Sequence, residues 1–352
     1  MSNSQNIKQE VPQIQGGAKR IEYIDAMRGF TMFLVVMFHV AFYCFHSADK
    51  QYSFTGYLMQ IRMPLFFFIS GFVLYKRDVI WDASQIIKFF KKKIPVQLIA
   101  PFLFFAIYTY VFNKDLILNF FTDGKCGYWF TFVLFVFFVI YATVRFSIRK
   151  WWADLVLVLL GVGLYATKWF EYRDFVPIDD RVLSLLSVNF WYLFIFFVTG
   201  TLVKKHFSAF ERLLDGKWLT ALSVLFYFLM NAYAKQLPVD FKFILPFLSL
   251  TGIVVVFSFF RQKQALFSKQ TAFGSTMQYV GRRTLDIYLI HFFLIPYNLS
   301  FVTFFTDHPM PVMEFLASGL ISVVIMALSL LVSNVIRLSP ILAHWLFGAK
   351  KT

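Results

Sequence analysis

The sequence predicts an all-α integral membrane protein, a helical bundle with about ten transmembrane helices. Of its 352 residues, 59% are hydrophobic and only 15% are charged, whereas soluble domains have about 25% charged residues. The apolar residues lie in long blocks instead of alternating with polar ones, which is typical of membrane-spanning helices. The net charge of +15 comes mainly from lysines and arginines between these blocks, and this placement argues against nucleic-acid binding.

Ten stretches of the chain are candidate spans, since a membrane-crossing helix needs about 20 predominantly apolar residues. They are residues 30–46, 55–75, 94–112, 128–145, 151–168, 185–203, 218–234, 243–260, 284–299 and 312–336. Residues 1–19 are polar and lack the apolar core of a signal peptide, so they are predicted to form a disordered cytoplasmic tail. Residues 20–340 then form the transmembrane domain, and residues 341–352 form a second cytoplasmic tail.

The distribution of basic residues between the spans predicts the orientation of the chain. Loops that face the cytoplasm carry an excess of lysine and arginine. With the N-terminus placed inside, the inner segments hold 25 basic residues and the outer loops hold 8, with Arg62 left over in the second span. This ratio predicts a multi-pass protein of the inner membrane, surrounded by lipid, with both termini cytoplasmic.

The first span has an arginine at its inner end and a histidine near its middle, within DAMRGFTMFLVVMFHV, residues 25–40. Arg28 and His39 are eleven positions apart, so they return to within about 20° of the same helix face and are separated by about 16 Å. Asp25 lies one turn before Arg28 and near the same face, and it is a candidate substrate-binding residue. An ionisable group deep in a membrane is costly and is therefore a functional candidate. His39 is either a general base or a neutral histidine bonded to a neighbouring helix.

The second span contains a proline and small residues, within IRMPLFFFISGFVLYKR, residues 61–77. Pro64 begins or kinks the helix, and Ser70 and Gly71 allow close approach of another helix. Arg62 lies at the outer end, where it either reaches the membrane interface or binds an anion, and the first interpretation is favoured. Arg62 and Ser70 are candidate substrate-binding residues.

A lysine cluster precedes the third span, within KFFKKKIPVQLIAP. Lys88, Lys91, Lys92 and Lys93 all fall in the inner loop of residues 76–93, which holds six basic residues. Such a cluster anchors a span on the cytoplasmic side, and this accounts for much of its charge. It is also a candidate site for the phosphates of an anionic cofactor.

Two further segments carry candidate substrate-binding residues. The late span RRTLDIYLIHFFLIP, residues 282–296, places Tyr288 and His291 on one helix face, because they are three positions apart. Tyr128 and Trp129 lie before the fourth span, where they are interface anchors or stack on a sugar, with anchoring favoured. The sequence contains no HExxH or CxxC motif and no phosphate-binding or dinucleotide fingerprint, so no metal site is predicted.

Four segments of the chain resemble acyltransferase family 3, whose members O-acetylate bacterial surface glycans. They are YIDAMRGFTMFLVVMFHV, MPLFFFISGFVLYKR, the basic stretch before the IP dipeptide, and LDIYLIHFF. The resemblance implies a ten-helix membrane fold that passes an acyl group from cytoplasmic acyl-CoA to an acceptor within or beyond the bilayer. It also implies that His39 is the essential histidine and that Arg28 is its partner.

In that family, an Arg-x-x-Arg pair in the inner loop is implicated in binding CoA. The nearest match here is Lys88-x-x-Lys91, and lysine binds phosphate as a point charge without the bidentate grip of arginine. Acyl-CoA, with acetyl as the first choice, is thus the expected donor, and a hydroxyl of a surface or periplasmic carbohydrate is the expected acceptor. The alternatives are succinyl transfer on the same fold, and a transporter or flippase for a lipid-linked or anionic glycan.

Overall fold

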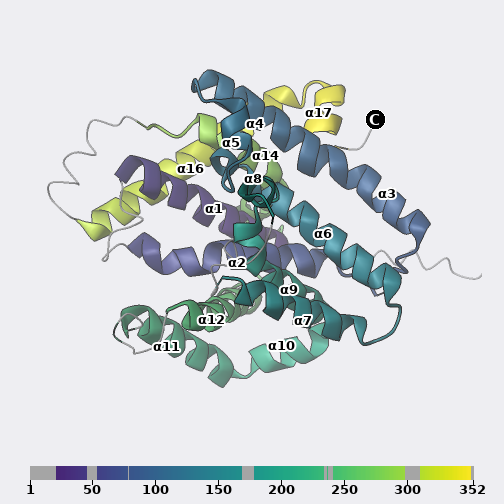
Figure 1. Ribbon diagram of the computed structural model, residues 1–352. Coiled ribbons are helices and arrows are strands. Elements are labelled where there is room, and N and C mark those ends of the chain that lie inside the picture. The colour runs from purple at the N-terminus through teal and green to yellow at the C-terminus, as the bar shows by residue number, and fades with distance from the viewer. Residues whose placement is uncertain are drawn as a thin grey trace, which may run out of the picture.

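The computed structural model describes residues 21–45, 54–77, 79–168, 178–233, 236, 241–297 and 310–349. Within these ranges the chain is helical and has no β-strand, which confirms the predicted all-α class. Helices α1 (Glu22–Phe45) and α2 (Phe54–Leu74) cross the middle of the bundle (Figure 1). On one side lie α11 (Lys217–Tyr233) and α12 (Phe241–Gln262), and on the other lie α4 (Ala100–Val111) and α17 (Pro340–Phe347). The predicted N-terminal tail, residues 1–19, lies outside the described residues.

The remaining helices follow in chain order. They are α3 (Ala83–Ile94), α4 (Ala100–Val111), α5 (Leu116–Phe120), α6 (Trp129–Ser147), α7 (Ala153–Ala166), α8 (Asp180–Leu185), α9 (Phe194–Lys205), α10 (Phe207–Asp215), α11 (Lys217–Tyr233), α12 (Phe241–Gln262), α13 (Ala272–Arg282), α14 (Thr284–Ile290), α16 (Pro311–Ile336) and α17 (Pro340–Phe347). Four short turns connect some of them: a π-helical turn η1 (Pro95–Ile99) and the 3₁₀ turns η2 (Lys125–Gly127), η4 (Val188–Leu193) and η6 (His291–Phe293).

The number of spans is the part of the predicted fold that the described residues leave unconfirmed. Six helices are long and apolar enough to cross a membrane, or seven if Val188–Lys205 and the sharply bent Phe207–Asp215 form one span. Each of the ten predicted stretches overlaps a helix, but α7, α11 and the segment Thr284–Phe293 are shorter than a span needs. Within the described residues, the fold is therefore a membrane-type helical bundle with six candidate spans.

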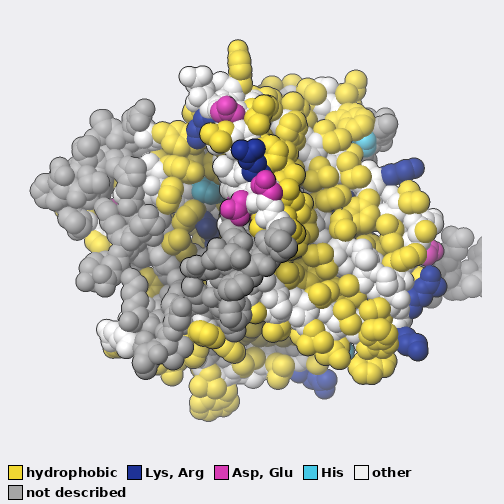
Figure 2. Space-filling view, viewed as in Figure 1, with side chains coloured by type: hydrophobic (Ala, Val, Ile, Leu, Met, Phe, Trp, Pro, Cys, Tyr) yellow, Lys and Arg dark blue, Asp and Glu magenta, His cyan; other side chains and the backbone are white. Residues whose placement is uncertain are grey.

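Helix α16 shows that the bundle is built for an apolar surrounding. Its buried face is lined by the four serines Ser318, Ser322, Ser329 and Ser333, each with no exposed surface. Its leucines and valines point the other way, and Leu320 is 69% exposed. Figure 2 shows one face of the molecule covered mostly by hydrophobic side chains. Large apolar side chains outside and small polar ones inside are typical of helices that pack in lipid.

Helices α2 and α9 touch backbone to backbone through a glycine on each side. A Cβ added to Gly71 would overlap the carbonyl group of Phe197, and one added to Gly200 would overlap that of Phe68. Small residues at such contacts allow helices to pack closely where no hydrophobic effect between helices is available. The expected role of Gly71 in close helix approach is thus seen in the packing of α2 on α9.

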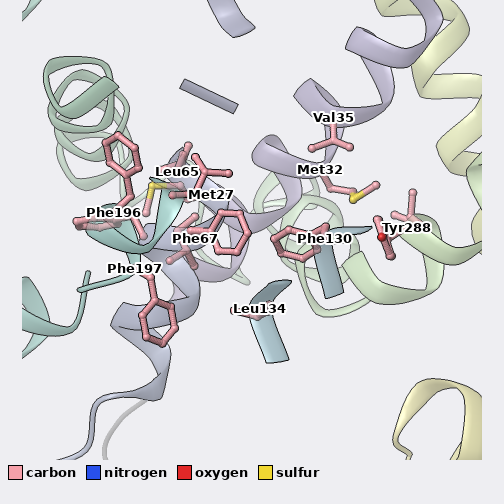
Figure 3. Close-up of a cluster of buried hydrophobic side chains, with 14 of the residues drawn as sticks. Met27, Met32, Val35, Leu65, Phe67, Phe130, Leu134, Phe196, Phe197 and Tyr288 are labelled. Carbon is pink, nitrogen blue, oxygen red and sulfur yellow. The ribbon is translucent and has the colours of Figure 1, made fainter. Parts of the chain in front are cut away.

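Aromatic rings fill the centre of the bundle between α1, α2, α6 and α9. Figure 3 shows Phe67 of α2 close to Phe130 of α6, with ring centroids 5.0 Å apart. Nearby, Phe196 and Phe197 of α9 are almost fully buried. Aromatic pairs at such separations are worth about 0.5–1.5 kcal/mol beyond the area that they bury. The result is a rigid centre around which the cavities described below are arranged.

Two predicted boundaries differ from the helices observed. The first span was predicted to start at residue 30, but α1 begins at Glu22, because Asp25 and Arg28 form an ion pair at 3.8 Å and their charges do not interrupt the helix. At the other end, the range predicted to be a tail, 341–352, includes most of helix α17, whose Phe347 is buried. The two cysteines, Cys44 and Cys126, are both free.

Candidate active site

Two histidines that are 252 positions apart in the chain meet in the bundle. Nδ1 of His39 on α1 lies 3.1 Å from Nε2 of His291, and the two rings are nearly parallel. His291 is fully buried, where α14 ends and continues as the turn η6. The mid-span histidines that the sequence singled out separately therefore form one pair.

The backbone of α14 determines which nitrogen of this pair is free. Nδ1 of His291 lies 3.0 Å from the carbonyl oxygen of Ile287 and 2.9 Å from that of Tyr288. A carbonyl only accepts hydrogen bonds, so this nitrogen carries the proton. With both imidazoles neutral, Nε2 of His291 then accepts a hydrogen bond from Nδ1–H of His39. The unprotonated Nε2 of His39 is left as the basic atom of the pair.

His39 lines a mainly apolar cavity of about 250 Å³. The wall includes Phe38 on the same helix, Arg62 and Met63 of α2, and Trp129 of α6. Trp129 is stacked on Phe190 at 3.7 Å between ring centroids, and this pair closes one side of the cavity. A neutral imidazole in a mainly apolar cavity of this kind is suited to general-base chemistry.

A second and larger cavity of about 530 Å³ lies toward the C-terminal end of α2, and we call it the cationic cavity. The cavity is lined by four basic residues, Arg28, Lys76, Lys93 and Arg282. None of the described residues that line it is an aspartate or a glutamate. The guanidinium of Arg28 also donates a hydrogen bond of 3.3 Å to Thr284. A cavity with this excess of positive charge and a volume within the usual range of about 300–1,000 Å³ for ligand pockets is suited to an anionic ligand.

Three aromatic side chains separate the two cavities. Phe66, Phe130 and Tyr288 line both of them. The Phe130 ring lies 4.7 Å from that of Phe66 and 5.7 Å from that of Tyr288. Arg28 and His39, predicted to share one helix face, thus open onto neighbouring cavities with a partition of rings between them.

The lysine cluster is divided by the faces of α3. Lys93 is half-buried and lines the cationic cavity, whereas Lys88, Lys91 and Lys92 are exposed and do not line it. Following α3, the π-helical turn η1 carries Gln97, which is 7% exposed, lines the same cavity and has an Oε1 atom without a hydrogen-bond partner. Such π turns occur frequently at functional sites.

The other predicted site residues lie around these cavities in different ways. Ser70 lines the cationic cavity and donates its hydroxyl to the carbonyl of Phe66. Asp25 is buried beside Arg28 and is not among the residues lining that cavity. Tyr128 is fully buried and donates a hydrogen bond of 2.9 Å to the carbonyl of Leu289, so its hydroxyl holds α14 in place.

The loop before α6 is held against the site by a buried lysine. The Lys125 ammonium is 1% exposed and donates hydrogen bonds to the carbonyls of Thr122 and Ser184 and to the hydroxyl of Ser187. Burial lowers the pKa of the Lys125 ammonium to about 8.

Two residues later, Gly127 has a φ of +97°, which favours glycine. The carbonyl of Gly127 accepts a hydrogen bond from the hydroxyl of Tyr288.

A comparison with protein families decides the class to which this arrangement belongs. A family model described as an acyltransferase domain, that of acyltransferase family 3, matches residues 21–333. The chain belongs to acyltransferase family 3. The matched range includes both histidines and all four basic residues of the cationic cavity. No curated protein and no solved structure matches the chain.

Sequence reasoning did not select three of the residues that line the cationic cavity. Lys76 and Arg282 both lie in the quoted segments, but the excess of basic residues in inner loops already explained their charge. Gln97 carries a clearer signal, because it is a polar residue two positions after Pro95 within an apolar run. A proline and an amide at that spacing indicate a local break in the helix with a polar group to satisfy.

Proposed function

We propose that the protein is an O-acyltransferase that moves an acyl group, acetyl as the first choice, from acyl-CoA to a hydroxyl of a cell-surface or periplasmic carbohydrate. The membership of acyltransferase family 3 supports acyl transfer. The observation that carries the proposal is the His39–His291 pair, whose basic nitrogen belongs to a cavity next to a cation-lined one. Donor and acceptor can then approach the same base from different sides.

The cationic cavity is the proposed binding site of the donor. Arg28, Lys76, Lys93 and Arg282 would attract the phosphates of CoA, and the pantetheine arm would extend toward the ring partition. Gln97 supports this choice of ligand. Its buried Oε1 has no partner in the described structure, and an unpaired buried acceptor is costly. The pantetheine arm contains amide N–H groups that can donate to it.

The proposed reaction uses His39 as the general base. Its Nε2 removes the proton from the acceptor hydroxyl as that oxygen attacks the thioester carbonyl. The carbon–sulfur bond then breaks, and the proton on Nε2 passes to the leaving CoA sulfur. Nδ1–H of His39 donates to His291 throughout, which fixes the ring and helps to stabilise the imidazolium that forms in the transition state.

The direction of transfer is part of the proposal. With the basic loops on the inner side, the end of α2 that lines the cationic cavity faces the cytoplasm, where acyl-CoA is available. The ten-span topology in the inner membrane, with both termini cytoplasmic, belongs to the same proposal. A periplasmic or surface glycan would then approach His39 from the opposite side of the membrane, through the His39 cavity.

A combined cell and in vitro experiment tests this function. Glycan from a deletion strain should lack one acetyl mass per modified site, and purified protein with labelled acetyl-CoA should restore it, whereas the His39→Ala variant should not. Labelled succinyl-CoA in a parallel reaction separates acetyl from succinyl transfer. A deletion strain whose glycan is still fully acylated but is retained inside the cell would instead identify a flippase and overturn the proposal.

A further inference from the structure

A third cavity of about 240 Å³ adjoins the His39 cavity toward the N-terminal end of α2, and we call it the Arg62 cavity. Arg62 and Met63 line both cavities. The rest of its wall includes Tyr192 of η4, Phe196 of α9 and Ser249 of α12. None of the described residues that line the Arg62 cavity also lines the cationic cavity. The Arg62 cavity is therefore placed to hold a second substrate next to His39.

Among the described residues that line these two cavities, Arg62 is the only one with a permanent charge. His39 becomes charged only when it takes up a proton. No carboxylate lines them, and Nε of Arg62 is buried without a hydrogen-bond partner. Burying a cation without a counter-ion or hydrogen bonds is expensive. A purely structural role would be served at lower cost by an apolar side chain, so the charge indicates a site suited to an anion.

The position of the guanidinium shows where an anion would bind. Cζ of Arg62 lies 3.5 Å from the centroid of the Phe38 ring on α1. This cation–π contact directs the side chain toward α1, beside the wall that the two cavities share. A stacked guanidinium still presents its N–H edges in one plane, which matches carboxylate and phosphate groups.

We propose that the Arg62 cavity binds the acceptor through an acidic group, a carboxylate or phosphate that the sugar carries near the hydroxyl to be acylated. This inference rests on the proposed acyl transfer, whose acceptor class it specifies. The small volume shared by His39 and Arg62 keeps the anion and the reacting hydroxyl on one sugar unit. Tyr192 lies in the same wall and can offer its hydroxyl to a neutral sugar hydroxyl, whereas the Ser249 hydroxyl already donates to the carbonyl of Gln60.

An acidic acceptor also solves an electrostatic difficulty of the site. When His39 takes the proton, its imidazolium and the Arg62 guanidinium both border one mainly apolar cavity. Two like charges in a low dielectric repel strongly. An anion already bound to Arg62 removes most of this repulsion, so a protonated His39 is tolerated only when the correct acceptor is present. Binding of the acidic group thereby favours catalysis on acidic sugars over neutral ones.

The test compares matched sugars in the full-length protein purified in detergent. Methyl β-D-glucuronide, methyl β-D-glucoside and methyl β-D-glucoside 6-phosphate are each titrated, and binding is read from the shift of the thermal unfolding midpoint. We expect at least one anionic sugar to bind tenfold or more tighter than the neutral one, with the preference reduced by salt. The tighter of the two anionic sugars identifies the acidic group.

Arg62→Gln should reduce the affinity for the anionic sugar to that for the neutral glucoside and leave the latter unchanged. Arg62→Lys, which keeps the charge, should retain part of the preference, and this variant serves if the glutamine variant does not fold. Arg181→Gln is the matched control, because Arg181 is an exposed cation on α8.

The proposal is overturned if the wild-type protein binds all three sugars equally, or if the preference survives in folded Arg62→Gln. The proposal is also overturned if Arg62→Gln lowers the rate of acyl transfer to acidic and to neutral sugars by the same factor. That result would mean that Arg62 stabilises the oxyanion of the transition state. Binding is measured without acyl-CoA. A clear preference in a protein that transfers no acyl group would therefore reject the proposed function and retain the anion site.

Discussion

The basic atom of the histidine pair is selected by two backbone carbonyls. They belong to Ile287 and Tyr288 and accept from Nδ1–H of His291, and this forces Nδ1–H of His39 to donate to His291. The sequence indicated His39 because this residue lies deep in a predicted span, and Arg28 because it lies on the same helix face as His39. It could not indicate that His291 is the partner of His39, because 252 positions separate them and only the packing of α14 against α1 brings them together.

His39 is expected to tolerate no substitute that lacks a basic nitrogen at the position of Nε2. General-base catalysis contributes roughly 10²–10⁴ in rate, so His39→Ala should lower the rate of acyl transfer by about that factor, with acyl-CoA binding nearly unchanged. His39→Gln keeps a polar group but cannot hold a proton at neutral pH, so it should be equally inactive. The measurement is single-turnover transfer from labelled acetyl-CoA by folded variants. A glutamine variant with near wild-type rate would make His39 a structural residue.

His291 is expected to show the opposite pattern, because its role is to position His39. The amide oxygen of His291→Gln can accept from Nδ1–H of His39 as Nε2 does, so this variant should retain a substantial part of kcat. His291→Phe preserves the ring volume but offers no acceptor, so kcat should fall about tenfold or more while KM for acyl-CoA stays within a factor of two. Equal activities of the two variants would show that the hydrogen bond between the histidines is not used.

At the scale of single elements, α3 directs Lys93 into the cationic cavity and leaves Lys91 and Lys92 exposed on the outside of the bundle. Lys93→Gln should therefore raise KM for acyl-CoA several-fold, and the effect of salt on KM should weaken because one phosphate contact is lost. Lys91→Gln, which removes the same charge from the exposed face, should change KM by less than a factor of two. An equal rise in both variants would indicate a general surface attraction instead of a defined donor site.

The close contact of α2 with α9 depends on the absence of a side chain at Gly71. Gly71→Ala places a methyl group against the backbone of Phe197, and overpacking of this kind costs about 1–3 kcal/mol or more. Its thermal unfolding midpoint in detergent should fall clearly. Gly163→Ala in α7 is the control, because a Cβ there meets no atom within 4 Å and alanine is about 1 kcal/mol more favourable than glycine within a helix. Similar midpoints in both variants would contradict the tight α2–α9 contact.

Hydropathy predicts some elements of this protein better than others, for physical reasons. A long apolar run such as α12 or α16 must be helical in lipid, because its backbone hydrogen bonds have to be satisfied within the segment. The segment Thr284–Phe293 is short, and its core residues, including Ile287, Leu289 and His291, are fully buried. Protein surrounds these residues, so its length is not set by the membrane. Composition alone cannot distinguish this case from a full span.

At the scale of the whole molecule, the three cavities follow one another along α2. Residues from Met59 to Lys76 line them in turn, first the Arg62 cavity, then the His39 cavity and then the cationic cavity. From Met59 to the end of α2 at Leu74 the helix rises by about 22 Å, which is about three quarters of the hydrocarbon thickness of about 30 Å. The sequence singled out some of the lining residues one at a time, such as Arg28, His39 and Arg62, but the order of the cavities along α2 follows only from tertiary packing.

The direction of transfer across this path depends on which end of the bundle is cytoplasmic. Both positions chosen to test it, Asp179 and Arg149, are exposed, and the excess of inner basic residues predicts Asp179 outside and Arg149 inside. Single cysteines at these positions should be introduced after replacing Cys44 and Cys126 by serine, so that no native thiol reacts. A membrane-impermeant maleimide added to intact cells, or to spheroplasts if an outer membrane blocks it, should label Asp179→Cys and leave Arg149→Cys unlabelled until the membrane is permeabilised. The reverse pattern would open the cationic cavity to the outside, away from cytoplasmic acyl-CoA, and would exclude the proposed route of the donor.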